Sequence, residues 1–299
     1  MFSCNNHEAN SKNGKIDREL RLVWLYCVID DATKRIIGRS RLRSRGPMPA
    51  LTDVEALTIE IYGETLGLKS DASIWRYACD HLRSWFPGLG TEWNFVRRCA
   101  NLSGLKERIQ ESLFAPSEEW NVFDGLPLPV CKHTRWRRDK RFRGEAAVSV
   151  CAAKNERYYG FKAGMLMNAS GEFFRWWLGP ANGSERDMLD SGVSSMTGLL
   201  LADKGLVSTD LAERLAMRGV VLTTPKLGQT QDVRSDWWIR QAMRLRRGIE
   251  TAFGRLVEDF GVLRNRGRDF WRWSARFLRK VLAYNLLLRF ERSVAAGGR

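Results

Sequence analysis

The sequence predicts an α/β (α+β) protein in which an all-helical N-terminal region precedes a mixed sheet flanked by helices. Three observations carry this prediction. Helix-capping signals and helical spacing dominate residues 50–116, apolar runs of strand length recur over residues 119–223, and a long amphipathic pattern follows from Trp237. A chain of 299 residues with 44% apolar content can bury a core. We expect three segments, residues 1–49, 50–116 and 117–292.

The first two segments differ in their predicted order. Residues 1–49 are expected to form a polar arm, structured only from about Leu22, and a basic linker that ends in Gly-Pro-Met-Pro. From Thr52 the pattern TDVE predicts a capped helix, and three more short helices follow up to residue 116. The third carries the pair Arg97-Arg98. Such a set is compatible with a helix-turn-helix DNA reader, and an ordinary helical bundle is the alternative.

Three acids occupy comparable positions in the third segment. Asp124 ends an apolar run, and the glycine and two prolines that follow predict that the strand leaves the sheet at once. Asp203 ends the apolar run at 198–202 in the same way. Glu250 lies inside the amphipathic helix pattern, with Arg246 one turn before it. Strand ends of open α/β sheets collect functional side chains, so we expect these acids to meet.

The order of elements in the third segment is that of a ribonuclease H-like domain. Strands are predicted at 119–124, 146–153, 158–167, 172–178, 198–202 and 220–223, with helices at 184–196, at 211–217 and from 237. Three carboxylates at such a site can hold two Mg²⁺ ions, with Asp124 bridging them, because Mg²⁺ keeps several waters. A metal pair suits in-line phosphoryl transfer. Arg246 is expected to orient Glu250 or to hold the scissile phosphate.

The net charge of +15 favours a polyanionic partner, nucleic acid before an acidic membrane surface. A dense basic stretch follows the first predicted strand, where it is expected to hold a phosphate backbone beside the metals; a solvated loop is the alternative. Its candidate DNA-binding residues are Lys132, Arg135, Arg137, Arg138, Lys140 and Arg141. The apolar stretch at 22–29 is far shorter than the roughly 20 residues of a membrane span, which predicts a cytoplasmic protein.

Several other residues have competing interpretations. Cys131 and His133 suggest a hydrolase, but the surrounding positive charge and the missing oxyanion-hole signature argue against it. Asp187 is either a fourth acid near the metals or, as we favour, a helix-start residue. The aromatics at 237–238 and 270–273 can stack on a displaced base or, as we favour, belong to a core or subunit contact. The helix predicted at 277–290 is expected to pack on the catalytic domain.

Four segments resemble the catalytic domain of bacterial insertion-sequence DDE transposases, closest to the insertion-sequence-982 family. They read FDGLPLPVCKHTR, YYGFKAGMLMNASGEF, LLADKGL and RRGIETAFGRLVEDFGVLRNR, and LTDVEALTIEIYGETLGL resembles the N-terminal helical region of that family. The resemblance covers most of residues 50–290. It implies that Asp124, Asp203 and Glu250 are the metal-binding acids. Related proteins often carry Tyr-x₂-Arg-x₃-Glu-x₆-Lys, of which Arg and Glu are present here, while Met243 and Val257 replace the other two.

The resemblance also implies an activity. A DDE transposase hydrolyses a phosphodiester at the transposon end and joins the freed 3′-hydroxyl to target DNA, using two Mg²⁺ ions or Mn²⁺ as substitute. The implied partners are double-stranded DNA, as terminal inverted repeats and as target, and further copies of the chain in a homo-oligomer on DNA. The implied location is the bacterial cytoplasm, at the nucleoid. The alternative is a non-catalytic DNA-binding protein derived from a transposase.

Overall fold

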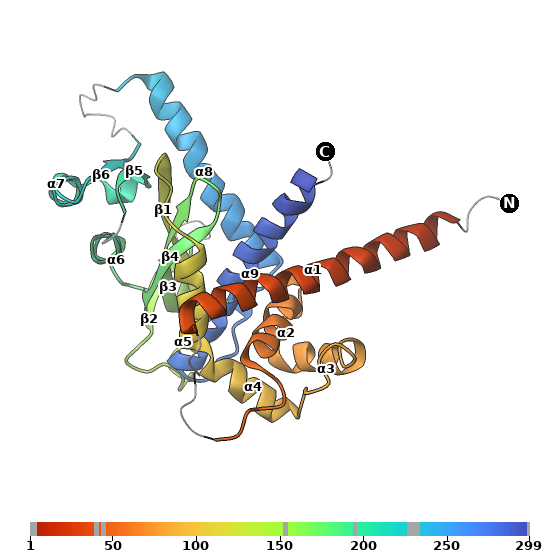
Figure 1. Ribbon diagram of the computed structural model, residues 1–299. Helices are drawn as coiled ribbons and strands as arrows, with labels where there is room; N and C mark the ends of the chain where they lie inside the picture. Colours follow the sequence, from red (N-terminus) through yellow and green to blue (C-terminus); the bar gives the residue numbers. More distant parts are fainter. Residues whose placement is uncertain are drawn as a thin grey trace. The chain divides into compact units, whose positions relative to one another are not determined.

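The computed structural model describes residues 5–38, 42, 46–151, 155–193, 196–225 and 234–297 (Figure 1). The chain divides into two compact units, Met1–Leu113 with Leu278–Arg299, and Phe114–Phe277. The predicted catalytic segment ran to residue 292, so its residues 278–292 fall in the first unit instead. Part of the basic linker, residues 39–41 and 43–45, lies outside the described residues.

The first unit is helical. Its elements are α1 (Asn5–Ile37), α2 (Asp53–Thr65), α3 (Asp71–His81), α4 (Glu92–Asn101), α5 (Ser103–Leu113) and the second part of α9 (Phe270–Gly297). The prediction of a loose arm before Leu22 was wrong, because α1 begins at Asn5. Leu22, Leu25 and Ile29 are at most 2% exposed and recur at helical spacing. Packing of this buried stripe nucleates the helix. Each polar residue before Leu22 can then extend the helix by one backbone hydrogen bond, without a new nucleation cost.

Helix starts follow the predicted capping signals. The Thr52 hydroxyl accepts from the Glu55 N–H at 3.1 Å, and the Glu55 carboxylate accepts from the Thr52 N–H at 2.6 Å, which confirms the capping box. Thr91 likewise caps α4. No helix of the described ranges has both the length and the apolar character that crossing a membrane requires.

A group of six ionised side chains lies inside the first unit, five of them buried and one, Asp71, partly exposed. Lys106 pairs with Glu60 at 2.9 Å, Arg279 pairs with Glu60, Glu64 and Asp71 at 3.1, 2.6 and 2.6 Å, and Lys280 pairs with Glu64 at 2.8 Å. We call this set the buried ion cluster. Its three carboxylates balance three cations, and these contacts explain why residues 278–292 belong with the helices of the first unit.

The second unit contains one mixed sheet. Its strands are β1 (Trp120–Lys132), β2 (Ala147–Cys151), β3 (Glu156–Asn168), β4 (Phe173–Pro180), β5 (Gly198–Leu201) and β6 (Val220–Thr223). Strand β3 pairs antiparallel with β1 on one edge and with β2 and β4 on the other, while β5 is parallel to β1 and β6 to β5. The resulting order, β4-β3-β1-β5-β6 with β2 as an addition, confirms the predicted ribonuclease H-like mixed sheet.

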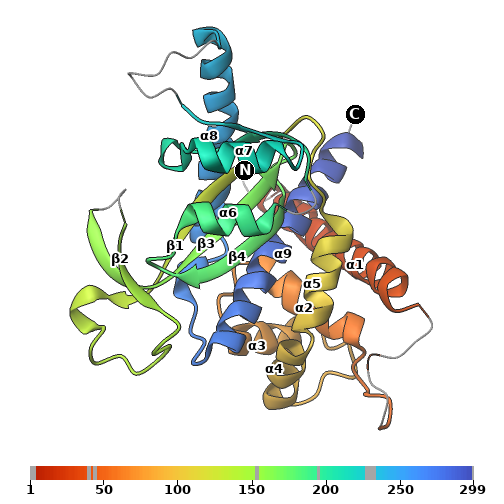
Figure 2. The ribbon, with the colours of Figure 1, turned by 90° about the vertical axis from the view of Figure 1, so that its left-hand side faces the viewer.

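Helices cover both faces of this sheet. Helices α6 (Glu185–Gly192) and α7 (Thr209–Ala216) lie on one face, and α8 (Asp236–Glu258) lies on the other (Figures 1 and 2). Short 3₁₀ turns, η1 (His133–Arg135), η3 (Lys204–Leu206) and η4 (Val262–Arg264), connect the elements. Phe123, Phe161 and Phe173 are at most 1% exposed and fill the space beneath the helices.

Strand β1 is longer than the sequence predicted. Instead of leaving the sheet after Gly125, it continues to Lys132, with Pro127 opposite Lys162 and Pro129 opposite Gly160 on β3. Pairing with β5 ends at Val122, so the prolines lie where one edge of β1 has no described neighbour. Proline is tolerated on such an edge because no ladder bond is lost there. A register shift between Pro129 and Cys131 adjusts the end of the strand.

Candidate active site

The two aspartates meet at the end of a parallel strand pair. The last paired residues of β1 and β5 are Val122 and Leu201, and each aspartate follows two residues later along its own strand direction. Asp203 lies just after β5, where it begins the turn η3. Asp124 lies within β1 rather than at its end, but beyond the reach of β5. Parallel strands bring their carboxyl ends to one edge of the sheet, which places the two carboxylates together.

Helix α8 brings the glutamate to the same place. Its buried stripe consists of Ile239, Ala242, Ile249, Ala252 and Leu256. Arg246 continues this stripe between Ala242 and Ile249, and its side chain is only 14% exposed. Glu250 flanks the stripe and is 54% exposed. The apolar residues therefore fix the helix on the sheet, and the arginine in their row points toward the strand ends.

One guanidinium joins the three predicted acids. Nη2 of Arg246 lies 3.1 Å from Oδ2 of Asp124 and 3.9 Å from Oδ1 of Asp203, and Nη1 lies 3.1 Å from Oε1 of Glu250. The acids come from β1, from the turn after β5 and from α8. The structure thus brings together the four residues Asp124, Asp203, Glu250 and Arg246. Arg246 contacts Glu250, as one of the two predicted roles requires, and both aspartates as well.

Burial dominates the electrostatics of Asp124. Desolvation raises its pKa to about 6, and the neighbouring carboxylates of Glu185 and Asp203 act in the same direction. The Arg246 guanidinium and the Gly125 N–H, which donates to Oδ1 at 2.8 Å, oppose the rise because both favour the carboxylate. The guanidinium and the N–H therefore offset only part of the desolvation that raises the pKa of Asp124.

Sequence reasoning missed Glu185. A Cβ added at Gly125 would lie 2.5 Å from Oε1 of Glu185, so this carboxylate rests against the backbone beside Asp124. Lys162 on β3 pairs with the same oxygen at 3.1 Å. Asp187, the acid considered from sequence, lies in the first turn of α6, where its N–H donates to the Ser184 cap at 3.3 Å. The predicted helix start at 184 was the available signal, since Glu185 directly follows the cap.

The basic stretch after β1 lies farther from the acids than expected. We define the basic loop as Lys132–Arg143. Since β1 continues for eight residues past Asp124, the loop begins roughly 25 Å from that carboxylate at about 3.3 Å per residue. The prediction that it lies beside the metals was wrong, because the strand does not end at Gly125. Its exposed cations are Lys132, Arg135, Arg137, Arg138, Lys140 and Arg143, whereas Arg141 is half-buried and bound to Asp139.

Aromatic side chains anchor the basic loop. Phe142 is 4% exposed and packs against Phe161 with ring centroids 5.2 Å apart. Its carbonyl accepts from the Tyr159 hydroxyl at 2.9 Å, and its φ of 58° lies in the left-handed region. Trp136 lies beside the Tyr159 ring, with centroids 6.2 Å apart. The loop is therefore held to the sheet while most of its cations face solvent.

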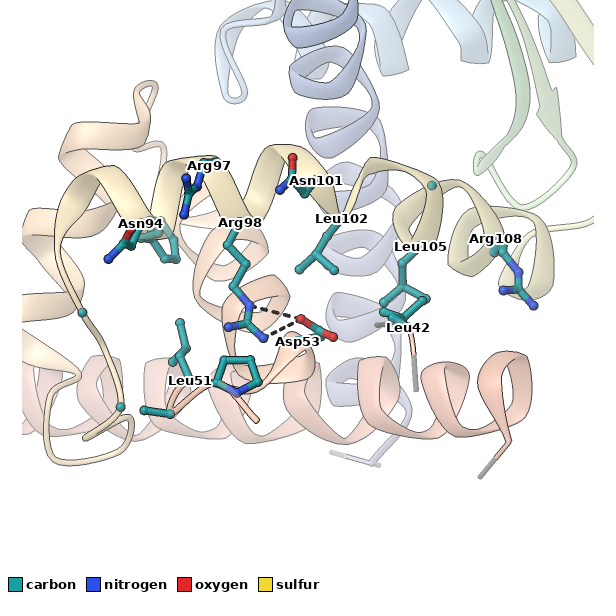
Figure 3. Close-up of a pocket in the computed structure, with 16 residues that line it drawn as sticks. Leu42, Leu51, Asp53, Asn94, Arg97, Arg98, Asn101, Leu102, Leu105 and Arg108 are labelled. Carbon is teal, nitrogen blue, oxygen red and sulfur yellow. Dashed lines mark hydrogen bonds and ion pairs between the residues drawn. The ribbon is translucent and has the colours of Figure 1, made fainter. Parts of the chain in front are cut away.

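In the first unit, the two predicted DNA-binding arginines differ. Arg97 is exposed on α4 together with Asn94 and Asn101, which lie three and four residues away on the same side of the helix. Arg98 instead turns to Asp53, with Nε and Nη2 at 3.1 and 2.5 Å from Oδ1 (Figure 3). These side chains border a hollow of about 900 Å³ between residues 42–53 and α4–α5. Of the two arginines, Arg97 is thus the exposed one, and Arg98 is bound within the unit.

Two minor hypotheses also receive structural evidence. Burial and the Asp139 carboxylate raise the pKa of the Cys131 thiol, the opposite of what a thiolate nucleophile needs.

Of the aromatics, Trp273 is 2% exposed and packs on Phe161, which makes it part of the core. Trp237 and Trp271 are 64% and 47% exposed, so they remain candidates for base stacking.

The donor set fits a hard divalent cation. Carboxylate oxygens are the ligands that Mg²⁺ and Mn²⁺ prefer, and three carboxylates here converge on a single positive group. Within the described residues no three His, Cys, Asp or Glu side chains are close enough together to form a metal cluster. The three carboxylates lie instead around the Arg246 guanidinium.

Comparisons with known proteins identify the family of this chain. Residues 116–269, just over half of the chain, match the family model of the transposase DDE domain. The fold is similar to that of a piggyBac transposase in a cryo-EM structure of its synaptic complex with hairpin DNA, with a TM-score of 0.50 and 9% identity over 94% of this chain and 76% of that one. No curated protein sequence matches. The family match over half of the chain identifies this protein as a member of the transposase DDE domain family.

Proposed function

We propose that this transposase hydrolyses a phosphodiester at each end of its element and then joins the freed 3′-hydroxyl to target DNA. The observation that carries the proposal is the convergence of Asp124, Asp203 and Glu250 on one guanidinium. These acids correspond, in order along the chain, to the acids that the resemblance implies bind metal. By the same motifs we infer the insertion-sequence-982 group and a bacterial source.

Asp124, Asp203 and Glu250 would hold two Mg²⁺ ions, or Mn²⁺ in their place, with Asp124 shared between the ions. When bound, such ions supply activation of the attacking oxygen and neutralisation of charge on the leaving oxygen. The position of Asp124 beside the same guanidinium as Asp203 and Glu250 supports its place among these ligands. Glu185 lies next to Asp124 and adds negative charge there.

The two proposed steps balance without a nucleophilic side chain. In hydrolysis, a water oxygen bonds to phosphorus, the bond from phosphorus to the 3′-oxygen breaks, and the water proton ends on that oxygen. In strand transfer, the 3′-oxygen bonds to a target phosphorus, and the displaced target 3′-oxygen takes the proton. The protein must therefore bind and orient phosphates, for which Arg246 at the acids and the basic loop along the sheet are suited.

Double-stranded DNA is the proposed partner, as terminal repeat and as target. The net charge of +15 supports it, as do the exposed cations of the basic loop and Arg97 on α4. The similar piggyBac transposase was solved with hairpin DNA in a synaptic complex. By analogy we propose that copies of this chain form a homo-oligomer on paired DNA ends, at the bacterial nucleoid.

A cleavage assay tests this function. Labelled DNA carrying the element's own end would be incubated with Mg²⁺ or with chelator, using the wild type, Asp124→Asn, Glu250→Gln and Asp187→Asn. We expect metal-dependent cutting by the wild type and the Asp187 variant, which is the control acid on α6. Both active-site variants should bind DNA but not cut it. Binding without cutting by the wild type under every metal tested would favour the non-catalytic DNA-binding alternative.

A further inference from the structure

The position of Arg246 has a consequence for metal binding. Its Nη atoms contact an oxygen of each of the three acids, at 3.1, 3.9 and 3.1 Å. Among the described residues, no other lysine or arginine pairs with Asp124, Asp203 or Glu250. The guanidinium therefore occupies the centre of the negative charge, and it uses oxygens that metal ions would need as ligands.

This guanidinium cannot step aside by losing its charge. Arginine stays protonated at every pH at which proteins remain folded, so a divalent ion at the same carboxylates would meet a fixed positive charge. Burial strengthens the repulsion, since the Arg246 side chain is 14% exposed and Asp124 is 19% exposed. Metal ions and the guanidinium are thus competitors for one set of ligands in the DNA-free protein.

A DNA phosphate offers the guanidinium another partner. Arginine binds phosphate through two parallel N–H groups, and the Nε–H of Arg246 has no hydrogen-bond partner among the described residues. The side chain is attached to α8 one turn before Glu250, so rotation about its own bonds can move the guanidinium while the helix stays in place. A phosphate at the strand ends could draw the guanidinium from the carboxylates without any change of fold.

We infer that Arg246 keeps the three carboxylates from binding metal until a DNA phosphate takes the guanidinium, so that DNA binding and metal binding promote each other. This inference rests on the proposed function, because it assumes that the acids hold metal and that DNA reaches them. It goes beyond the roles of orienting Glu250 or holding the scissile phosphate. Thermodynamic linkage requires the coupling to be mutual and equal in both directions.

The test compares two neighbouring arginines on α8. Arg246→Gln removes the competing cation, whereas Arg247→Gln removes the same charge from an exposed position on the same helix. Binding of Mn²⁺ alone to the DNA-free proteins would be measured from the free-ion signal in electron paramagnetic resonance. We expect Arg246→Gln to raise Mn²⁺ affinity about tenfold or more, and Arg247→Gln to leave it near the wild-type value. Adding Asp124→Asn to Arg246→Gln should remove the gain.

The second arm measures the coupling itself. Fluorescence anisotropy would give the affinity for a short labelled duplex with and without Mn²⁺. Mn²⁺ should raise the DNA affinity of the wild type and of Arg247→Gln by the same factor. It should raise the DNA affinity of Arg246→Gln by a smaller factor. Arg246→Lys keeps the positive charge but not the two parallel N–H donors of the guanidinium, and it serves as the control for folding. Its Mn²⁺ affinity should lie between those of the wild type and Arg246→Gln.

The outcomes separate this inference from the proposed function. Equal or weaker Mn²⁺ binding by folded Arg246→Gln would overturn the inference, because the arginine would then support the ligands rather than compete for them. The metal site and the proposed cleavage would be untouched by that result. Absence of any Mn²⁺ binding that depends on Asp124, in the wild type and in Arg246→Gln, would overturn both.

Discussion

Replacing Glu64 with glutamine should strongly destabilise the first unit, because it removes a carboxylate from the buried ion cluster. Glu64 is 1% exposed and pairs with Arg279 at 2.6 Å and with Lys280 at 2.8 Å. In the wild type the cluster contains three carboxylates and three cations. The glutamine variant leaves one buried cation in excess, since Glu60 and Asp71 already pair with Lys106 and Arg279.

The expected cost follows from known cases of broken buried pairs. Removing one partner of a buried ion pair destabilises by about 3 to 5 kcal/mol, which is a large part of the total stability of a typical domain. At about 2 to 4 °C per kcal/mol the melting temperature should fall by at least about 6 °C. Urea unfolding followed by circular dichroism would measure the loss. Glu111→Gln, an exposed glutamate on α5, is the matched control and should stay within about 0.5 kcal/mol of the wild type.

The pH dependence provides a second check on the same cluster. Burial lowers the pKa of Lys280 below its usual 10.5, although Glu64 acts against this. A lowered pKa means that the folded protein binds the Lys280 proton less tightly than the unfolded chain does. The contribution of Lys280 to the free energy of unfolding is thus lost as pH falls through its folded-state pKa. It is recovered as pH rises toward 10.5, the usual pKa of a lysine. Above that pH Lys280 is neutral in the folded and the unfolded state, so the stability difference between Glu64→Gln and the wild type should shrink to the part that comes from the Arg279 pair. If Glu64→Gln were as stable as Glu111→Gln at neutral pH, the stabilising role of the buried ion cluster would be refuted.

Three further predictions concern other elements. Gly192→Ala should destabilise the second unit by about 1 to 3 kcal/mol in urea unfolding, because a Cβ there would overlap the Trp177 ring. Thr52→Ala should cost about 1 kcal/mol through loss of the α2 capping box, measured against Thr52→Ser, which keeps the hydroxyl. Arg137→Gln and Arg138→Gln should each lower the slope of log DNA affinity against log salt by about 0.9. Both should leave cleavage at saturating DNA unchanged, because the basic loop begins roughly 25 Å from the acids; slower cleavage would contradict this distance.

Local signals in the sequence were enough to find most elements. The capping box at Thr52 sets the start of α2, and the short apolar run at 220–223 coincides with β6. The extent of β1 could not be predicted in the same way. Whether a strand continues through Pro127 and Pro129 depends on which of its edges is paired, and that is a property of the whole sheet.

The buried ion cluster was beyond sequence reasoning for a similar reason. On α2, Glu60 and Glu64 follow Leu57 by three and seven residues, so they lie on the same helix face as the apolar residues Leu57 and Ile61. That spacing places two carboxylates on an inward face, but it does not say which cations compensate them. In the structure α2 is buried over residues 56–64, because other helices surround it. The cations that compensate Glu60 and Glu64 come from α5 and α9, more than 40 residues away in each case.

The candidate site combines both kinds of information. The spacing of Arg246 and Glu250 is enough to predict their contact, since residues four apart share a helix face. Asp124 lies 122 residues before Arg246, and their contact depends on the register of β1 against β5 and on the buried stripe of α8. Without its contacts to Asp124 and Asp203, Arg246 would only be a neighbour of Glu250. With them, it competes with metal ions for all three carboxylates. The distinction matters for function, because an arginine that merely orients Glu250 would strengthen metal binding, whereas one that neutralises the whole acid set must weaken it until phosphate replaces the carboxylates as its partner.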